Sequence, residues 1–132
     1  MDDTVSSSLL PRLTTERTLW CCTLRPDGSP HLTPVWFVHR EGVFWIGTAA
    51  HSVKVRNVRA DPRVSLALPD GDAPVVAEGS ARLLADAYPE DVVTAFAAKY
   101  DGWDVRDPLG DGTPGALLEV PVRRWLMAGA AH

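Results

Sequence analysis

The sequence lacks a long apolar run, an excess of positive charge and a spaced set of cysteines, and each absence excludes a class of protein. No apolar segment approaches the ~18 residues of a membrane-spanning helix, so we expect no membrane partner. The formal net charge of −4 argues against a general nucleic-acid-binding protein. Cys21 and Cys22 are adjacent and would point to opposite faces of a strand, which disfavours a disulfide between them and excludes a zinc-finger spacing. We expect both to be buried thiols.

Motifs of the common catalytic classes are also missing. The sequence contains no glycine-rich nucleotide- or phosphate-binding loop, no H-E-x-x-H and no G-x-S-x-G. The four histidines, His31, His39, His51 and His132, have no metal-ligand spacing, so we predict no metal site. The first residues are acidic and lack the basic start and apolar segment of a signal peptide, so we expect a cytoplasmic protein.

Length and periodicity indicate one mainly β domain. The 132 residues, 45% of them hydrophobic, suffice for a single core, and we expect one domain over residues 1–132 with a flexible N-terminus at 1–8. Mostly hairpin connections favour an antiparallel barrel or sandwich, with a long loop at 101–115. The patterns predict strands at 19–24, 30–38, 43–48, 63–68, 75–84 and 116–127, with short helices near 9–13, 52–59 and 89–100.

The segment from Thr48 to Pro62 has the pattern of a strand end followed by a short helix that could bind an anion. Ser52 is a good N-cap residue, and Lys54 and Arg56 follow within the first turns. A helix N-terminus offers unpaired N–H donors and the positive end of a dipole, which favours phosphate or carboxylate groups. An ordinary solvated helix with a polar cap would show the same spacing, so both readings stay open.

Four segments in order resemble the pyridoxamine 5′-phosphate oxidase-like split barrels, the flavin/deazaflavin oxidoreductases. Within them, Pro34-Val-Trp36 and Lys54-x-Arg56-Asn57 are most similar to the actinobacterial branch that uses coenzyme F-420, an 8-hydroxy-5-deazaflavin. The Ser-x-Lys element also occurs in relatives that bind FMN. The resemblance implies a six-stranded antiparallel split barrel of the FMN-binding type, acting as a homodimer with cofactor sites at the interface. The matching segments are 24–37, 44–48, 52–65 and 76–81.

The resemblance also implies which residues bind the cofactor. The strand that contains Pro34 would lie along the flavin ring, although a proline there also suits a barrel-closing bulge. Trp36 would form a wall of the ring pocket or fill the core. Lys54 suits a phosphate, and Arg56 suits the polyglutamate tail of the deazaflavin. The predicted cofactor-binding residues are Pro34, Val35, Trp36, Thr48, Ser52, Lys54, Arg56 and Asn57.

The function that follows from the resemblance is hydride transfer between coenzyme F-420 and a small electron-poor organic substrate. Because the cofactor carries such chemistry, no dedicated catalytic residue is assigned, and water or Tyr100 could supply a proton. Tyr100 and Trp103 could instead pin the long loop. An FMN-binding oxidoreductase of the same fold and a non-catalytic flavin- or haem-binding protein remain alternatives. Oxidation of pyridoxamine phosphate itself is not expected, because the sequence has no C-terminal Arg-x-His signature.

Overall fold

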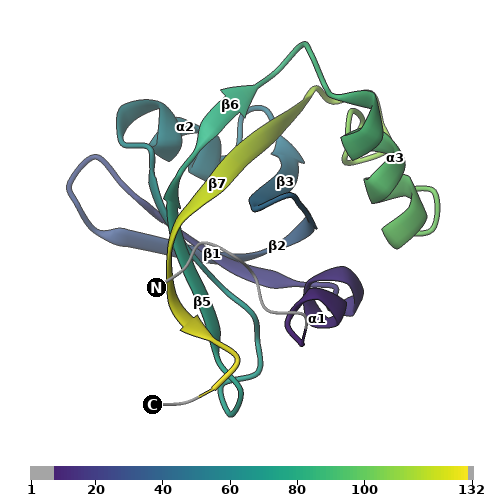
Figure 1. Cartoon of the computed structure of the whole chain (residues 1–132). Coiled ribbons are helices and arrows are strands. Elements are labelled where there is room, and N and C mark those ends of the chain that lie inside the picture. The colour runs from purple at the N-terminus through teal and green to yellow at the C-terminus, as the bar shows by residue number, and fades with distance from the viewer. Residues whose placement is uncertain (1–7, 131–132) are drawn as a thin grey trace.

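The strands of this chain close into an antiparallel barrel (Figure 1). The computed structural model describes residues 8–130, so most of the segment expected to be flexible, 1–8, lies outside the described residues. The strands β3, β2, β1, β4, β5 and β7 pair in that order, and pairing of β3 with β7 completes the ring. The predicted six-stranded antiparallel barrel is therefore confirmed, with one short extra strand, β6. The bounds are β1 Leu19–Leu24, β2 Pro30–Arg40, β3 Val43–Ala49, β4 Arg63–Ala67, β5 Val75–Ser80, β6 Arg82–Leu84 and β7 Gly115–Ala128.

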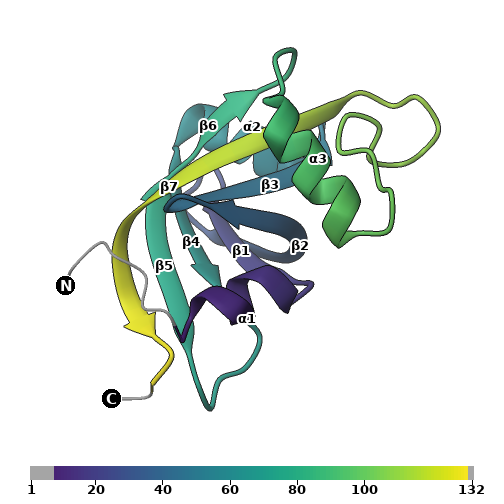
Figure 2. The ribbon, with the colours of Figure 1, turned by 45° about the vertical axis from the view of Figure 1, so that its right-hand side comes forward.

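Three helices cover parts of the barrel within residues 8–130. They are α1 (Leu10–Thr15), α2 (Val53–Ala60) and α3 (Glu90–Lys99), close to the predicted positions. Figure 2 shows α1 and α3 on the same side of the barrel, and both pack on β2. In the described part of the chain, no helix has the length and apolar character needed to cross a bilayer.

The hairpin between β1 and β2 follows directly from its turn residues. Gly28 adopts φ 85°, a conformation that glycine reaches without steric cost, and its N–H donates to Arg25 O at 2.8 Å. The carboxylate of Asp27 accepts from the N–H of Ser29 at 2.9 Å. The turn therefore directs β2 back along β1, with Trp20 opposite Pro34.

Two apolar clusters form the core, one inside the barrel and one beneath α3. Phe37 and Phe44 lie in the first cluster, whereas Trp45 and Phe96 lie in the second. Strand alternation predicts that only one of Phe44 and Trp45 points inward, but both are buried, because α3 and the long loop after it cover the outer face of β3. Burial on both faces explains why β3 has almost no polar residues.

The single strand predicted at 75–84 is wrong in one respect, because it breaks at Ala81. The N–H of Ala81 donates to Pro62 O at 2.8 Å, outside the ladder. On either side of this break, β5 and β6 pair with successive parts of the same edge of β7. The break lets one edge follow a long, strongly curved partner strand, which regular pairing would not allow.

Candidate functional site

The barrel splits between β2 and β3, and the split contains a cavity. The two strands pair only from Trp36 opposite Gly47 to Arg40 opposite Val43. Beyond this point β2 stays with β1, while the end of β3 stays with β7. Pro34 and Val35 pair with β1 along one edge of β2, and among the described strands none pairs with the other edge at this point, so the backbone groups that point to that edge are open to a ligand. The cavity has a volume of about 600 Å³, within the usual range for cofactor sites.

Five of the eight residues predicted to bind a cofactor line this cavity. They come from three elements that are separate in the chain: the free edge of β2, the end of β3 and the first turn of α2. Ser52 lies beside them, because the hydroxyl of Thr48 donates to Ser52 Oγ at 3.2 Å. The five lining residues are Pro34, Val35, Trp36, Thr48 and Lys54.

Lys54 is a half-buried cation without a counter-charge. Its Nζ donates to the hydroxyl of Thr48 at 3.4 Å, and within residues 8–130 it forms no ion pair. Burial lowers the pKa of Lys54. The nearby thiol of Cys21 is no counter-ion, because burial raises its pKa to about 12 and keeps it neutral at pH 7. An anionic ligand in the cavity would supply the missing negative charge.

The start of α2 adds to this positive field. The backbone N–H of Val55 donates to Ser52 Oγ at 3.4 Å, which confirms Ser52 as the N-cap. The N-terminal end of the helix therefore lies beside Thr48 and Lys54, where its dipole favours a negative group. No acidic residue occupies the first turn of this helix.

Aromatic rings form one wall of the cavity. The ring of Trp36 is 38% exposed and stacks on Tyr100 with 4.4 Å between centroids. Trp103 meets Trp36 edge to face at 5.1 Å, and its Nε1 donates to Pro108 O at 3.1 Å. Such a wall suits a planar conjugated ligand, since aromatic groups favour stacked or edge contacts.

Gly47 allows this wall to form. A Cβ atom at Gly47 would lie 2.8 Å from Cη2 of Trp103 and would also clash with Val105. Only a residue without a side chain lets the loop after α3 pack this closely on β3. Sequence reasoning missed this glycine, because the signal lies in a contact 56 positions along the chain and not in a turn.

Tyr100, suggested as a proton source, is not among the residues that line the cavity, and its hydroxyl is engaged by backbone groups. It accepts from the N–H of Phe37 at 2.9 Å and lies within hydrogen-bonding distance of two carbonyls, Arg17 O at 2.8 Å and Phe37 O at 3.0 Å. The residue is 3% exposed, and burial raises its pKa. Tyr100 instead anchors the last turn of α3 to β2.

Arg56 and Asn57 do not line the cavity. Asn57 is 2% exposed and its Nδ2 donates to the hydroxyl of Thr23 at 3.0 Å, so it joins α2 to the barrel. Arg56 is exposed and lines a smaller hollow of about 290 Å³ together with Arg25. Neither side chain therefore lies where it could contact a ring bound in the split.

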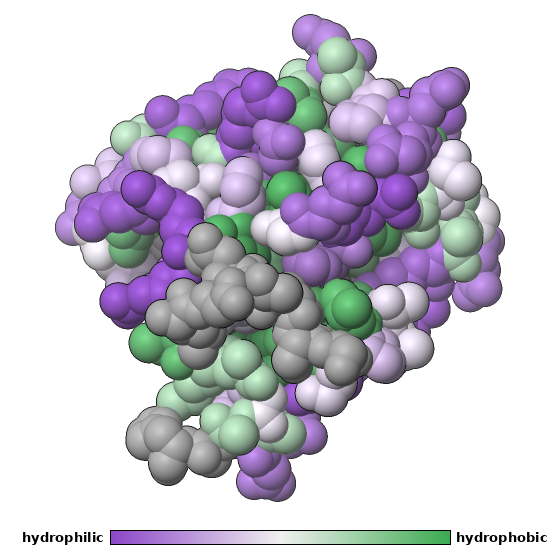
Figure 3. All heavy atoms as spheres, viewed as in Figure 1, coloured by the Kyte–Doolittle hydropathy of each residue, from purple (hydrophilic) through white to green (hydrophobic). Residues whose placement is uncertain are grey.

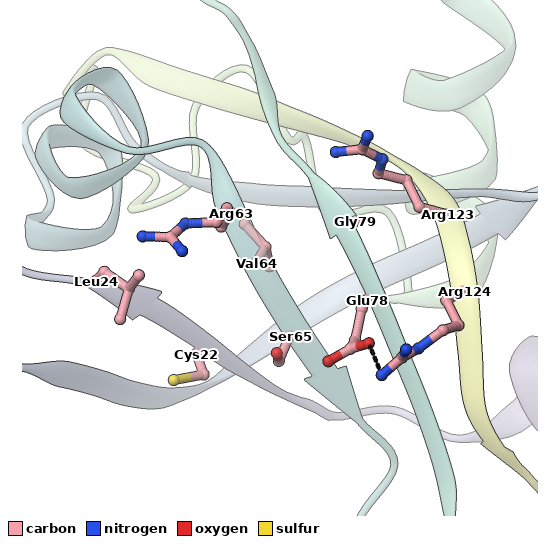
Figure 4. A pocket seen from close by; sticks show the side chains of 9 residues that line it. All are labelled: Cys22, Leu24, Arg63, Val64, Ser65, Glu78, Gly79, Arg123 and Arg124. Atoms are coloured by element: carbon pink, nitrogen blue, oxygen red, sulfur yellow. Dashed lines mark ion pairs between the residues drawn. The ribbon is translucent and has the colours of Figure 1, made fainter. Parts of the chain in front are cut away.

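The arginines of the last strand lie on another surface of the barrel. Figure 4 shows Arg63, Arg123 and Arg124 around a hollow of about 450 Å³ that none of the cavity residues lines. Alternation predicts that Arg123 and Arg124 point to opposite faces, but a register shift between Glu78 and Gly79 leaves both exposed. Figure 3 accordingly shows hydrophilic side chains over much of the face that includes β7.

The remaining cavity residues were not among the predicted site residues. Thr18 precedes β1, and Ala49 ends β3, so neither carries a recognisable signal. Trp103 lies on the loop after α3, so only the tertiary structure brings it to the cavity. Within residues 8–130, no group of three or more His, Cys, Asp or Glu side chains is arranged to hold a metal ion. The remaining lining residues are Thr18, Gly47, Ala49, Trp103, Pro108 and Leu109.

Comparison with known proteins identifies the class of this barrel. The sequence profile described as pyridoxamine 5′-phosphate oxidase matches residues 8–127, and the chain belongs to this split-barrel family. A conserved hypothetical protein of Mycobacterium tuberculosis is 32% identical, with a TM-score of 0.72, over 92% of this chain and 83% of that one.

More distant solved structures share the fold but differ in what they are named for. An F420 reductase is 22% identical, with a TM-score of 0.73, over 92% of this chain and 98% of that chain. HutZ, described as the haem storage protein of Vibrio cholerae, is 16% identical, with a TM-score of 0.73, over 92% of each chain. At these identities the similarity shows a common fold and leaves the ligand to be argued from the site.

Proposed function

We propose that this protein is an oxidoreductase that binds coenzyme F-420 in the split of the barrel and reduces a small electron-poor organic substrate. The observation that carries the proposal is Lys54, a half-buried cation without a counter-charge at the edge of a cavity with an aromatic wall. The likeness to an F420 reductase supports the choice of cofactor, although it rests on fold alone.

The described residues fit such a cofactor in three ways. The unpaired edge of β2 at Pro34 and Val35 presents backbone groups to the polar rim of a ring. Trp36 and Trp103 would contact its face or edge. Lys54 and the N-terminus of α2 would hold a phosphate.

We propose a basic path from the cavity to the hollow that contains Arg25 and Arg56, because Lys54 of the cavity and Arg56 of the hollow both lie on α2. Burial and the positive charges of Arg25 and Lys54 lower the pKa of His31. A coenzyme with a phosphodiester and a polyglutamate tail would use both regions, whereas FMN would use only the first. This path therefore favours the deazaflavin over FMN.

The bound coenzyme would supply the hydride chemistry. The chain would orient the ring against the Trp36 wall, shield it from water with the loop that carries Trp103, and fix the phosphate. With Tyr100 engaged by the backbone, water is the proposed proton donor.

We also propose a homodimer with its cofactor sites at the interface. Trp20 is 40% exposed and Leu32 is 59% exposed, on the outer faces of the paired strands β1 and β2. Leu126 on β7 is 50% exposed. Large apolar side chains in such positions often mark a subunit contact.

Side-by-side titration of the purified protein with coenzyme F-420 and FMN tests the cofactor assignment. We expect tighter binding of the deazaflavin, and oxidation of its reduced form when a conjugated carbonyl compound is added. Much tighter binding of FMN would support the position of the site but contradict the assignment of coenzyme F-420 as the cofactor. Tight binding without turnover of any acceptor would favour a storage protein, the function for which HutZ is named.

A further inference from the structure

A second groove lies between α1, α3 and the end of β2, on the side of the barrel seen in Figure 2. Its volume is about 600 Å³, and it shares no lining residue with the cavity in the split. The proposed function does not use it. The groove therefore needs its own explanation.

The base of this groove is apolar. Leu13 from α1 is 2% exposed and Val38 from β2 is 5% exposed. Ala95 and Ala98 from α3 line the third side, and their small side chains leave room between the helices. The polar lining residues are Thr14, Thr15, Arg17, His39, Arg40 and Lys99. A ligand that fills this space needs an apolar or aromatic body.

Two cations of the groove, Lys99 and Arg17, lie over the same Tyr100 ring without a carboxylate partner among the described residues. Lys99 Nζ lies 3.6 Å from the ring centre of Phe37, and the Arg17 guanidinium lies 4.9 Å from the ring centre of Tyr100. Neither forms an ion pair within residues 8–130. The third cation of the groove, Arg40, is already paired with Asp91 at 3.4 Å.

The present contacts of these cations use only part of their donor capacity. Lys99 Nζ donates to Leu13 O at 3.4 Å, and Arg17 Nη1 donates to Lys99 O at 3.2 Å. These bonds join the last turns of α1 and α3, where cations are favoured by the helix dipole. An ammonium has three donors and a guanidinium five, so several remain for a ligand.

Electrostatics also favour an anion here. Burial and the positive charge of Arg17 lower the pKa of Lys99 to about 8. The negative charge of Glu16 partly offsets this by raising the pKa of Lys99, but Glu16 is itself paired with Arg12 at 2.9 Å. A carboxylate placed between Lys99 and Arg17 would relieve their mutual repulsion.

We propose that the groove between α1, α3 and β2 is a second ligand site, which binds a small carboxylic acid with an apolar or aromatic body. Its carboxylate would lie between Lys99 and Arg17, and its body would cover Leu13 and Val38.

Calorimetric titration of the full chain with 4-phenylbutyrate and its neutral isostere 4-phenylbutanamide tests this site. We expect the acid to bind at least about tenfold more tightly than the amide, since a charge-assisted contact changes affinity by about ten- to a hundredfold. Lys99→Met should weaken binding of the acid by about the same factor and leave the affinity for the amide nearly unchanged. Arg40→Gln is the matched control, because Arg40 already has Asp91, and it should change the affinity by less than about threefold.

The proposal of a second site is wrong if the acid and the amide bind with equal affinity, or if neither binds at about 10 mM ligand. It is also wrong if Lys54→Met abolishes binding of the acid while Lys99→Met does not, because the acid would then lie in the split. Circular dichroism checks that Lys99→Met folds. If it does not, Arg17→Gln, at an exposed position, replaces it with the same expected loss.

Discussion

Replacing Lys54 by methionine should change cofactor affinity and the stability of the ligand-free protein in different directions. Methionine keeps an unbranched apolar side chain of similar length, so the change removes mainly the charge. Lys54 makes one long hydrogen bond, to Thr48 at 3.4 Å, and no ion pair among the described residues. Its lowered pKa shows that the fold disfavours its charge. The ligand-free variant should therefore be at least as stable as the wild type.

Cofactor binding should suffer in the same variant. A charge-assisted hydrogen bond to a phosphate contributes about 1.5–3 kcal/mol, which corresponds to about a ten- to hundredfold loss of affinity. High salt should reduce the difference between wild type and variant, because screening already weakens the contact in the wild type.

Titration with coenzyme F-420 and thermal melts of the ligand-free proteins measure the two effects. Arg59→Met is the matched control, since it removes a charge from an exposed position of the same helix α2. Unchanged cofactor affinity in Lys54→Met would refute the placement of the phosphate. A lower melting temperature without the cofactor would show that Lys54 stabilises the fold itself.

Trp36→Ala should weaken cofactor binding. It should lower the free energy of unfolding by less than the roughly 3–5 kcal/mol expected for a core tryptophan, because Trp36 is 38% exposed. Thermal melts and cofactor titration measure the two effects, and a loss of stability of that size with unchanged cofactor affinity would contradict the assignment. Arg56→Ala should weaken binding of a deazaflavin with a long glutamate tail most, of one with a short tail less, and of FMN least. Equal losses of affinity for all three ligands would show that the tail does not bind in the hollow beside Arg25. Light scattering at micromolar concentration should give a dimer mass, and a monomer mass would exclude the shared-site arrangement. Burial and the charge of Lys99 lower the pKa of His39 from 6.5 to about 4 in the folded protein. Between these pH values the unfolded chain binds more protons than the folded chain, so the free energy of unfolding falls as the pH drops through this range. His39→Gln should lose less stability than the wild type between pH 7 and about pH 5, and identical urea midpoint shifts would show that His39 is not responsible.

Local signals were sufficient wherever a feature depends on a few neighbouring residues. The turn at Pro26-Asp-Gly28 needs only a residue that tolerates φ 85°, and the start of α2 needs only the Ser52 hydroxyl. The alternating patterns of the strands likewise follow from one buried face. The capped-helix pattern pointed to Ser52, Lys54 and Arg56, and the resemblance added the other candidates. The structure brings five of the eight to one cavity.

Features that depend on partners far along the chain required the tertiary structure. The break at Ala81 and the bulge at Arg123 arise because β7 must curve while pairing along both edges. The burial of Tyr100 depends on its bonds to β2 and to Arg17.

The sequence by itself therefore determined where most strands, the β1–β2 turn and the capped helix lie, because alternation, turn residues and a capping hydroxyl are signals carried by neighbouring residues. Only the tertiary structure decided that Lys54 lacks a counter-charge and that Gly47 admits Trp103. It also showed that the Asn57 amide donates to Thr23 inside the fold. These properties depend on which groups lie nearby after the barrel closes, and sequence separation does not encode that distance.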